Sequence, residues 1–324
     1  MLYPLKFTPI LKDKIWGGTT LSKFGKQLSG ATHVGESWEL SAFDDQPSVV
    51  ASGALKDNDL SELIEVYMGD LVGDHVYEKY GNYFPLLIKL IDAEDKLSLQ
   101  VHPNDEAAWK EHQSSGKTEM WYVLDAEPGS TLTLGLKHEA KRSELEQSIF
   151  NGHFPDLLYT VPVHQGDVAF IPAGMLHAIG AGVRLVEIQQ ASDITYRLYD
   201  YDRRDAAGNK RELHLNKALE VLDYSANKEP LIDYTPKVNG AINLVSCDYF
   251  VTNLLCFDKC IVRDYAPLDS FVVYCLLSGS CSVETDLGNT ALQTEETVLL
   301  PAMCNDVKLT PLSRETRLLE VYVP

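Results

Sequence analysis

The stretch Gly166-Asp167-Val168-Ala169-Phe170-Ile171-Pro172-Ala173-Gly174-Met175-Leu176-His177 is the part of the sequence that predicts the fold. A Gly-Asp turn precedes an apolar strand over 168–171, and a Pro-x-Gly turn then brings His177 to the start of the next strand. A histidine held between two short strands could be one ligand of a metal site in a small β-barrel. We therefore look for further metal ligands upstream of this segment.

The rest of the chain reads as mainly β. We expect strands at 84–91, 97–102, 120–124, 131–136, 157–163, 168–171 and 183–190, and helices at 57–80, 104–113, 139–150 and 215–222. Residues 225–240 resemble a linker, and only strands and turns follow them. The expected architecture is two jelly-roll barrels with small helical insertions, in domains 1–235 and 236–324.

The second barrel is expected to lack a metal site. The segment from Leu277 to Pro301 repeats the turn-and-proline layout, and the position that corresponds to His177 is Asp306. No histidine follows His214, so Asp306 would have no imidazole partner in its own barrel. We read it as a solvated turn aspartate.

Composition limits the classes of partner. The chain has 324 residues and a formal net charge of −19, which argues against nucleic acid and anionic membranes as partners. An anionic substrate would need a locally positive site. No apolar run approaches the roughly 20 residues of a membrane span. The N-terminal residues lack the apolar core of a signal peptide, and the six cysteines contain no CxxC pair, so we expect a cytoplasmic protein with reduced thiols.

Four side chains are the candidate metal ligands: Gln100, His102, Glu119 and His177. The segment 97–102 alternates with period two, so Gln100 and His102 share one face of a strand with Ser98. Two imidazoles, a carboxylate and an amide oxygen suit zinc and, less selectively, iron, manganese or nickel. Each residue alone has an ordinary polar reading, and it is the joint spacing that favours a metal site.

These sequence motifs together resemble those of a known protein family. The segment 166–177 is similar to the second motif of the cupin barrels. Three motifs resemble those of the type I phosphomannose isomerases, and the resemblance covers about residues 1–220. They are Leu97-Ser98-Leu99-Gln100-Val101-His102-Pro103, Gly116-Lys117-Thr118-Glu119 and Glu187-x5-Asp193-x3-Arg197. The resemblance implies a zinc-dependent isomerase that interconverts mannose 6-phosphate and fructose 6-phosphate through a cis-enediol, and two cupin-type barrels of which the second has no metal site.

The resemblance also implies roles for ten residues. Gln100, His102, Glu119 and His177 match the family's zinc ligands, with one zinc ion per chain and other divalent ions left open. Lys117, Glu187, Asp193 and Arg197 match catalytic positions, and Ser98 and Arg203 match phosphate contacts. The implied partner is a small sugar phosphate, and the implied assembly is a monomer or weak homodimer.

Several alternatives remain open at this point. The proton-transferring base is Asp193, Glu187 or a group polarised by Lys117. Arg197 has a second reading as a structural ion-pair partner of Asp193, and Arg203 has one as part of a solvated charged loop. An iron-dependent cupin dioxygenase and a non-enzymatic sugar-binding cupin are the competing functions.

Overall fold

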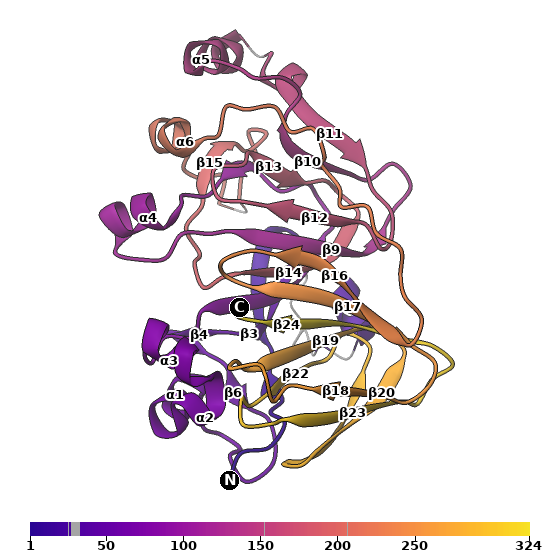
Figure 1. The fold of residues 1–324 in the computed structure, drawn as a ribbon. Coiled ribbons are helices and arrows are strands. Elements are labelled where there is room, and N and C mark those ends of the chain that lie inside the picture. Colours follow the sequence, from indigo (N-terminus) through magenta and orange to yellow (C-terminus); the bar gives the residue numbers. More distant parts are fainter. Residues whose placement is uncertain (25, 27–32, 152, 206) are drawn as a thin grey trace. The chain divides into compact units, whose positions relative to one another are not determined.

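The computed structural model describes residues 1–24, 26, 33–151, 153–205 and 207–324, and consists mainly of β-strands. The chain forms two compact units, which are described separately (Figure 1). We call Leu11–Ser37 with Lys89–Ile232 the central unit, and Met1–Ile10 with Trp38–Ile88 and Asp233–Pro324 the terminal unit. The expectation of a mainly β protein is confirmed.

Two sheets run through the central unit. The five-stranded sheet has the order β11 (Leu158–Pro162), β10 (Thr131–Leu136), β13 (His177–Ile179), β8 (Leu99–Val101) and β15 (Tyr196–Tyr199). The six-stranded sheet has the order β12 (Val168–Ile171), β9 (Glu119–Ala126), β14 (Val183–Gln190), β7 (Leu86–Ala93), β2 (Ile10–Gly18) and β3 (Val34–Leu40). A short 3-10 helix, η1, covers Thr20–Phe24.

The core of the central unit lies between these two sheets. Trp121 and Val123 of β9 pack in one buried cluster with Leu132 and Leu134 of β10, so the facing surfaces of both sheets are apolar. Burial of this apolar surface is the main term that holds the sheets together. The expected strands of this region are confirmed with small shifts at their ends.

A second buried cluster covers the other face of the five-stranded sheet. There, Leu99 and Val101 pack in one cluster with residues of α5 (Arg142–Asn151), α6 (Leu215–Val221) and the 3-10 helix η2 (Phe154–Leu157). Because side chains alternate along a strand, the outward direction of Leu99 and Val101 turns Gln100 to the interior between the sheets. The helix α4 (Asp105–His112) follows directly, and its N-cap Asn104 accepts a hydrogen bond from the Ala107 amide at 3.0 Å.

The terminal unit also contains two larger sheets. One has the order β16 (Gly240–Ser246), β17 (Val251–Phe257), β24 (Thr316–Tyr322), β19 (Val272–Ser278) and β22 (Thr297–Leu300), and the other β18 (Ile261–Asp264), β23 (Asp306–Pro311), β20 (Ser280–Thr285) and β21 (Gly288–Gln293). One buried cluster draws residues from both sheets. Two short ladders join β1 (Phe7–Thr8) with β6 (Val49–Val50) and β4 (Ala42–Phe43) with β5 (Gln46–Pro47).

The helical segment expected at 57–80 is three short helices: α1 (Leu60–Tyr67), α2 (Gly69–Val72) and α3 (Asp74–Tyr80). The chain turns at Met68, with φ of 47°, and at Gly73, with φ of 98°, and neither angle is helical. Helix α1 begins with a reciprocal capping box between Asp59 and Glu62. Among the described residues, no helix combines the length and the hydrophobicity needed to cross a bilayer.

Candidate active site

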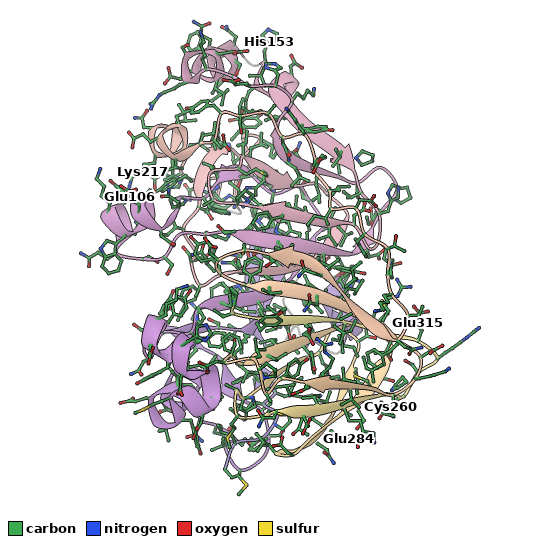
Figure 2. The ribbon with its side chains drawn as sticks, in the orientation of Figure 1. Glu106, His153, Lys217, Cys260, Glu284 and Glu315 are labelled. Carbon is green, nitrogen blue, oxygen red and sulfur yellow. The ribbon has the colours of Figure 1, made fainter. Side chains whose placement is uncertain are left out.

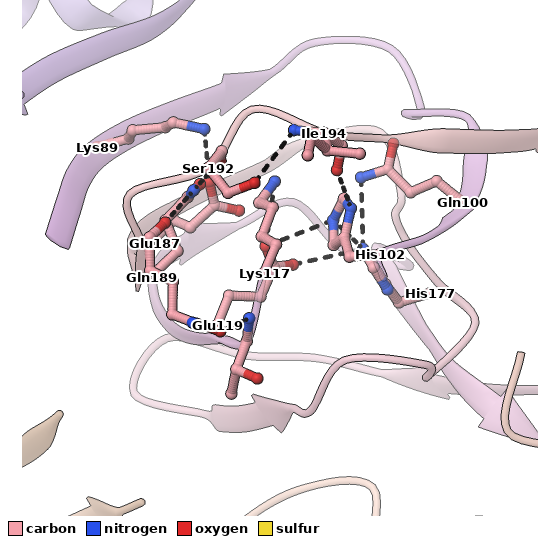
Figure 3. Close-up of polar contacts among 12 residues, drawn as sticks. Lys89, Gln100, His102, Lys117, Glu119, His177, Glu187, Gln189, Ser192 and Ile194 are labelled. Atoms are coloured by element: carbon pink, nitrogen blue, oxygen red, sulfur yellow. Dashed lines mark hydrogen bonds and ion pairs between the residues drawn. The ribbon is translucent and has the colours of Figure 1, made fainter. Parts of the chain in front are cut away.

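Three buried side chains, His102, Glu119 and His177, converge between the two sheets of the central unit. Their ligand-type atoms all lie within 4.8 Å of one another, and Figure 3 shows them turned toward a common centre. Glu119 is the first residue of β9 in the six-stranded sheet, and His177 is the first residue of β13 in the five-stranded sheet. The packing of the two sheets therefore brings the three residues together.

Hydrogen bonds fix which nitrogen of each imidazole carries the proton. His102 Nδ1 lies 2.8 Å from the Ile194 carbonyl oxygen, and His177 Nδ1 lies 2.8 Å from the Met175 carbonyl oxygen. Carbonyl oxygens only accept, so Nδ1 carries the proton in each neutral ring and Nε2 offers a lone pair. The two Nε2 atoms lie 3.1 Å apart. A cation between them would turn this repulsion into coordination.

The carboxylate of Glu119 would likewise be stabilised by a bound cation. It is fully buried, and neither oxygen has a well-formed hydrogen bond within the described part of the chain. The nearest polar atoms are His177 Nε2, at 3.3 Å from Oε1, and Lys117 Nζ and His102 Nε2, at 3.3 and 3.6 Å from Oε2. Burial raises the pKa of Glu119 to about 7, although Lys117 opposes this shift. A bound cation would satisfy both oxygens and keep the group ionised.

Gln100 lies at the same centre. Its Nε2 is 3.3 Å from His177 Nε2, and its Oε1 accepts a hydrogen bond from Ser98 Oγ at 3.2 Å. A rotation of the amide by half a turn exchanges the two atoms and presents the carbonyl oxygen to the centre. Tetrahedral ligands at about 2.0–2.2 Å from zinc lie about 3.3–3.6 Å from one another. The separations between the two histidines, between His177 and Gln100, and from each histidine to one oxygen of Glu119 are 3.1 to 3.6 Å, which fits a divalent ion of that size.

The two histidines are neutral at physiological pH. Burial lowers the pKa of His177 to about 4, and burial together with Lys117 lowers that of His102 well below its ordinary value. Neutral imidazole is the form that binds metal. The four predicted ligand residues thus form one cluster whose donor chemistry fits a divalent metal.

A buried ion pair borders this cluster. Lys89 Nζ donates to Glu187 Oε2 at 3.0 Å, and Trp121 Nε1 donates to Glu187 Oε1 at 2.9 Å (Figure 3 shows Lys89 and Glu187). Burial alone would raise the pKa of Glu187, but Lys89, Lys117 and the hydrogen bonds lower it to about 2. Burial alone would lower the pKa of Lys89, but Glu187 and neighbouring carboxylates hold it above its usual range. Both members of the pair are therefore charged.

A cavity of about 230 Å³ opens at this cluster. Predicted site residues among those that line it are Ser98, Gln100, Lys117, Glu187, Asp193 and Arg197. Arg197 donates through Nε to Ser98 Oγ at 3.3 Å and through Nη1 to the Glu212 carbonyl oxygen at 2.8 Å. It lies opposite Gln100 in the register of β15 and β8. One wall of the cavity therefore carries both a guanidinium group and a ligand residue.

Arg203 does not belong to this lining. Its Nη2 donates to Asp200 Oδ1 at 3.0 Å, and its Nη1 donates to Asp95 Oδ2 at 3.2 Å. The basic side chain that lines the cavity from the same part of the chain is Arg211. Arg211 binds the same carboxylate, with Nε 2.7 Å from Asp200 Oδ2 and Nη2 bonded to Oδ1.

Two residues of the site, Lys89 and Arg211, were not predicted from the sequence. Lys89 carried a usable signal, because it is the only charged residue in the apolar run 84–91 and a lysine in a buried strand requires a partner. Arg211 carried none, since nothing in the sequence separates it from Arg203 and Arg204. Its place depends on how the loop after β15 folds back.

A larger cavity, of about 380 Å³, lies on the helical side of the central unit. Its lining includes Glu106 of α4 and Lys217 of α6 (Figure 2). Lys217 Nζ pairs with Glu111 at 2.8 Å, and both side chains are about half exposed. None of the predicted site residues lines this cavity, so the chemistry is concentrated in the smaller one.

Known proteins resemble this chain over most of its length. Residues 4–132 match the family description "Phosphomannose isomerase type I, catalytic domain". Mannose-6-phosphate isomerase ManA of Bacillus subtilis is 42% identical over 254 residues, which span 76% of this chain and 77% of the relative. Mannose-6-phosphate isomerase of Streptococcus mutans is 36% identical over 306 residues, which span 93% of each chain.

The fold agrees as well. A crystal structure of mannose 6-phosphate isomerase from Bacillus subtilis superposes with a TM-score of 0.87 at 32% identity and covers 99% of both chains. Sequence identity above 30% over most of the chain and a shared fold over nearly all of it point to the same family. The chain therefore belongs to the type I mannose-6-phosphate isomerase family, whose members are aldose–ketose isomerases.

Proposed function

We propose that this chain interconverts mannose 6-phosphate and fructose 6-phosphate with one divalent ion, zinc by preference, held by Gln100, His102, Glu119 and His177. The observation that carries the proposal is the pair of unprotonated Nε2 atoms, 3.1 Å apart, next to the buried Glu119 carboxylate, which has no well-formed hydrogen bond among the described residues. Such a cluster is costly without a cation and well suited to one. The names of the relatives supply the substrate.

The reaction requires three things of the site. Aldose–ketose isomerisation moves a proton between C1 and C2 through a cis-enediol, so negative charge on the oxygens of these carbons must be stabilised. A base must reach both carbons, and a remote anchor must align the substrate. When bound, the divalent ion supplies the electrostatic stabilisation of the two oxygens. The remaining tasks fall to the side chains that line the cavity.

We assign proton transfer to Asp193. Glu187 accepts hydrogen bonds from Lys89 and Trp121, and its pKa of about 2 makes it a weak base. Lys117 Nζ lies 3.3 Å from Glu119 Oε2 and pairs with that carboxylate. Asp193 lines the cavity beside both groups. In this proposal Glu187 and Lys117 set the electrostatic field around the reacting carbons.

The anchor for the phosphate is the polar wall that contains Ser98 and Arg197. Their side chains contact each other at 3.3 Å and line the cavity together. Arg203, the third group expected there, adds positive charge from its place beside Asp200. These cations provide the local attraction that an anionic substrate needs in a chain with a net charge of −19. The charged lining also disfavours the dioxygenase alternative, which would require an apolar pocket.

We further propose two cupin-type jelly rolls, with catalysis in the domain 1–235 and no metal site in the domain 236–324, although the compact units described above place Met1–Ile10 and Trp38–Ile88 together with Asp233–Pro324. A buried cluster between two sheets in each unit supports this arrangement. Asp306 is exposed, which supports its reading as a solvated aspartate, but it begins strand β23 and pairs with Asp264 instead of lying in a turn. We expect a cytoplasmic monomer or weak homodimer, and the six free cysteines support a reducing compartment.

The test is a coupled isomerase assay on mannose 6-phosphate, with free mannose alongside. The purified protein should contain about one divalent ion per chain, should turn over the phosphorylated sugar, and should lose activity in EDTA. Added zinc should restore the activity of the dialysed apoprotein. Full turnover by protein that contains no metal by elemental analysis would contradict the proposal.

A further inference from the structure

The geometry points to Arg211 as a phosphate-binding residue of the cavity, held in place by Asp200. This inference rests on the proposed function and extends it, because neither the motif spacing nor the family resemblance assigns Arg211 a role. The ligand class is a phosphate monoester dianion, and the residue would set the preference for phosphorylated over free sugars.

The position of Arg211 in the cavity lining favours a phosphate contact. Arg211 lines the same cavity as Ser98 and Arg197, whereas Arg203 does not. The side chain of Arg211 is 27% exposed and contributes to the cavity lining. The side chain of Arg203 is 11% exposed and is engaged by Asp200 and Asp95. Of the two arginines bound to Asp200, only Arg211 can meet a ligand in the cavity.

The way in which Asp200 binds the guanidinium group of Arg211 also favours a phosphate contact. Asp200 accepts from Arg211 through Nε and Nη2, which is the side-on fork of an arginine–carboxylate pair. This arrangement leaves Nη1 for another acceptor. Because Asp200 is 6% exposed and fixed on both oxygens, it holds the plane of the guanidinium group before any ligand arrives.

The excess of positive charge around Arg211 favours an anionic ligand as well. Arg203 and Arg211 both pair with the buried carboxylate of Asp200, and Arg197 lies within its electrostatic range. Among the described residues, the other carboxylate that pairs with these arginines is Asp95, which is 57% exposed. Three guanidinium groups therefore share fewer negative charges than they carry. The field of Arg211 also lowers the pKa of Arg197, after the larger effect of burial. A dianion bound between these groups would remove the repulsion.

Arg203 then has an indirect role. Its bond to Asp200 Oδ1 at 3.0 Å holds the carboxylate that holds Arg211, which makes Arg203 and Asp200 positioning residues. The motif resemblance had placed the phosphate contact at Arg203, and the loop conformation transfers it to Arg211. Tyr201 and Asp202, both with φ near 57°, turn the chain so that the two arginines meet at one carboxylate.

The experiment compares Arg211→Gln with the matched control Arg204→Gln in the metal-loaded enzyme. Arg204 is exposed, lies in the same loop and, among the described residues, donates to the Gly208 carbonyl oxygen alone, so its substitution removes the same charge without touching the cavity. Calorimetry with inorganic phosphate, and inhibition of turnover by inorganic phosphate, are the two measurements. Arg211→Gln should raise the Kd for phosphate and the KM for mannose 6-phosphate about tenfold or more, with a smaller change in kcat. Arg204→Gln should change either by less than about twofold.

Metal content and the thermal midpoint are measured on every variant. If Arg211→Gln does not fold, Arg211→Lys, which keeps the charge beside Asp200, should still weaken phosphate binding severalfold because an ammonium cannot hold Asp200 and phosphate in one plane. Unchanged phosphate affinity in the folded variant overturns the inference. A wild-type enzyme that binds phosphate through Arg211 but does not isomerise mannose 6-phosphate would instead contradict the proposed function alone.

Discussion

The Nε2 atoms of His102 and His177 lie 3.1 Å apart, and each ring donates its Nδ1 proton to a backbone carbonyl oxygen. Both lone pairs thus point at the same small volume, which is also bordered by the Glu119 carboxylate, a group with no well-formed hydrogen bond in the part of the chain that the structure describes. The backbone around Met175 and Ile194 holds the rings in this orientation through those carbonyls. The fold itself therefore prepares the site for a cation.

Glu119→Gln should abolish tight metal binding. The substitution removes the only negative charge among the four ligand residues and leaves a weaker neutral oxygen donor, so the affinity for zinc should fall by about a hundredfold or more. Elemental analysis after dialysis against a mild chelator measures the loss. The matched control is Glu106→Gln on the exposed face of α4, which should retain the metal. Equal metal content in the two variants would count against the proposed ligand set.

Arg197→Ala should reduce kcat/KM on mannose 6-phosphate by at least about a hundredfold. The guanidinium contacts Ser98 and lines the cavity, and no described contact joins it to a metal ligand directly. The metal content should therefore stay at the wild-type value. Arg204→Ala controls for the loss of one charge in this region. If Arg197→Ala loses the metal together with activity, the residue is structural.

Lys89→Met should destabilise the protein by about 3–5 kcal/mol, because it leaves the Glu187 carboxylate buried without its cation. The double variant Lys89→Met with Glu187→Gln should recover much of that loss, since both buried charges are then removed. It should not recover catalytic activity. Urea unfolding of the single and double variants measures the coupling. A single variant as stable as the wild type would show that the pair contributes no such constraint.

Alkaline pH should destabilise the terminal unit through its buried tyrosines. The hydroxyl of Tyr265 bonds to Glu320 and to Tyr274, and burial raises the pKa of both tyrosines well above 10 in the folded chain. Because the folded pKa values lie above the unfolded value of about 10, each tyrosine contributes full stability below that pH. The contribution is lost as the pH rises above about 10 toward the folded pKa.

The measurement is the free energy of unfolding between pH 9 and about 11.5. Each such tyrosine should contribute a slope of up to about 1.4 kcal/mol per pH unit. Tyr274→Phe removes one of the two groups, so its stability should fall less steeply with pH than that of the wild type. Identical slopes for the two proteins would contradict this account.

Local spacing was sufficient to predict much of the fold. The strands at 168–171 and 183–190, the helix at 215–222 and the alternation around Gln100 follow from patterns of apolar residues, which act over a few residues. The helix expected at 57–80 is an exception, because the turns at Met68 and Gly73 break it into three pieces.

The sequence by itself determined the mainly β fold and the identities of the four candidate ligands, because strand periodicity and motif spacing are properties of short segments. Only the tertiary structure decided that Lys89 meets Glu187 across β7 and β14, and that Arg211 rather than Arg203 reaches the cavity. These outcomes depend on how two sheets pack and how one charged loop folds back. Contacts of that range are set by the burial of charges and by the energy of the whole fold, which no local pattern encodes.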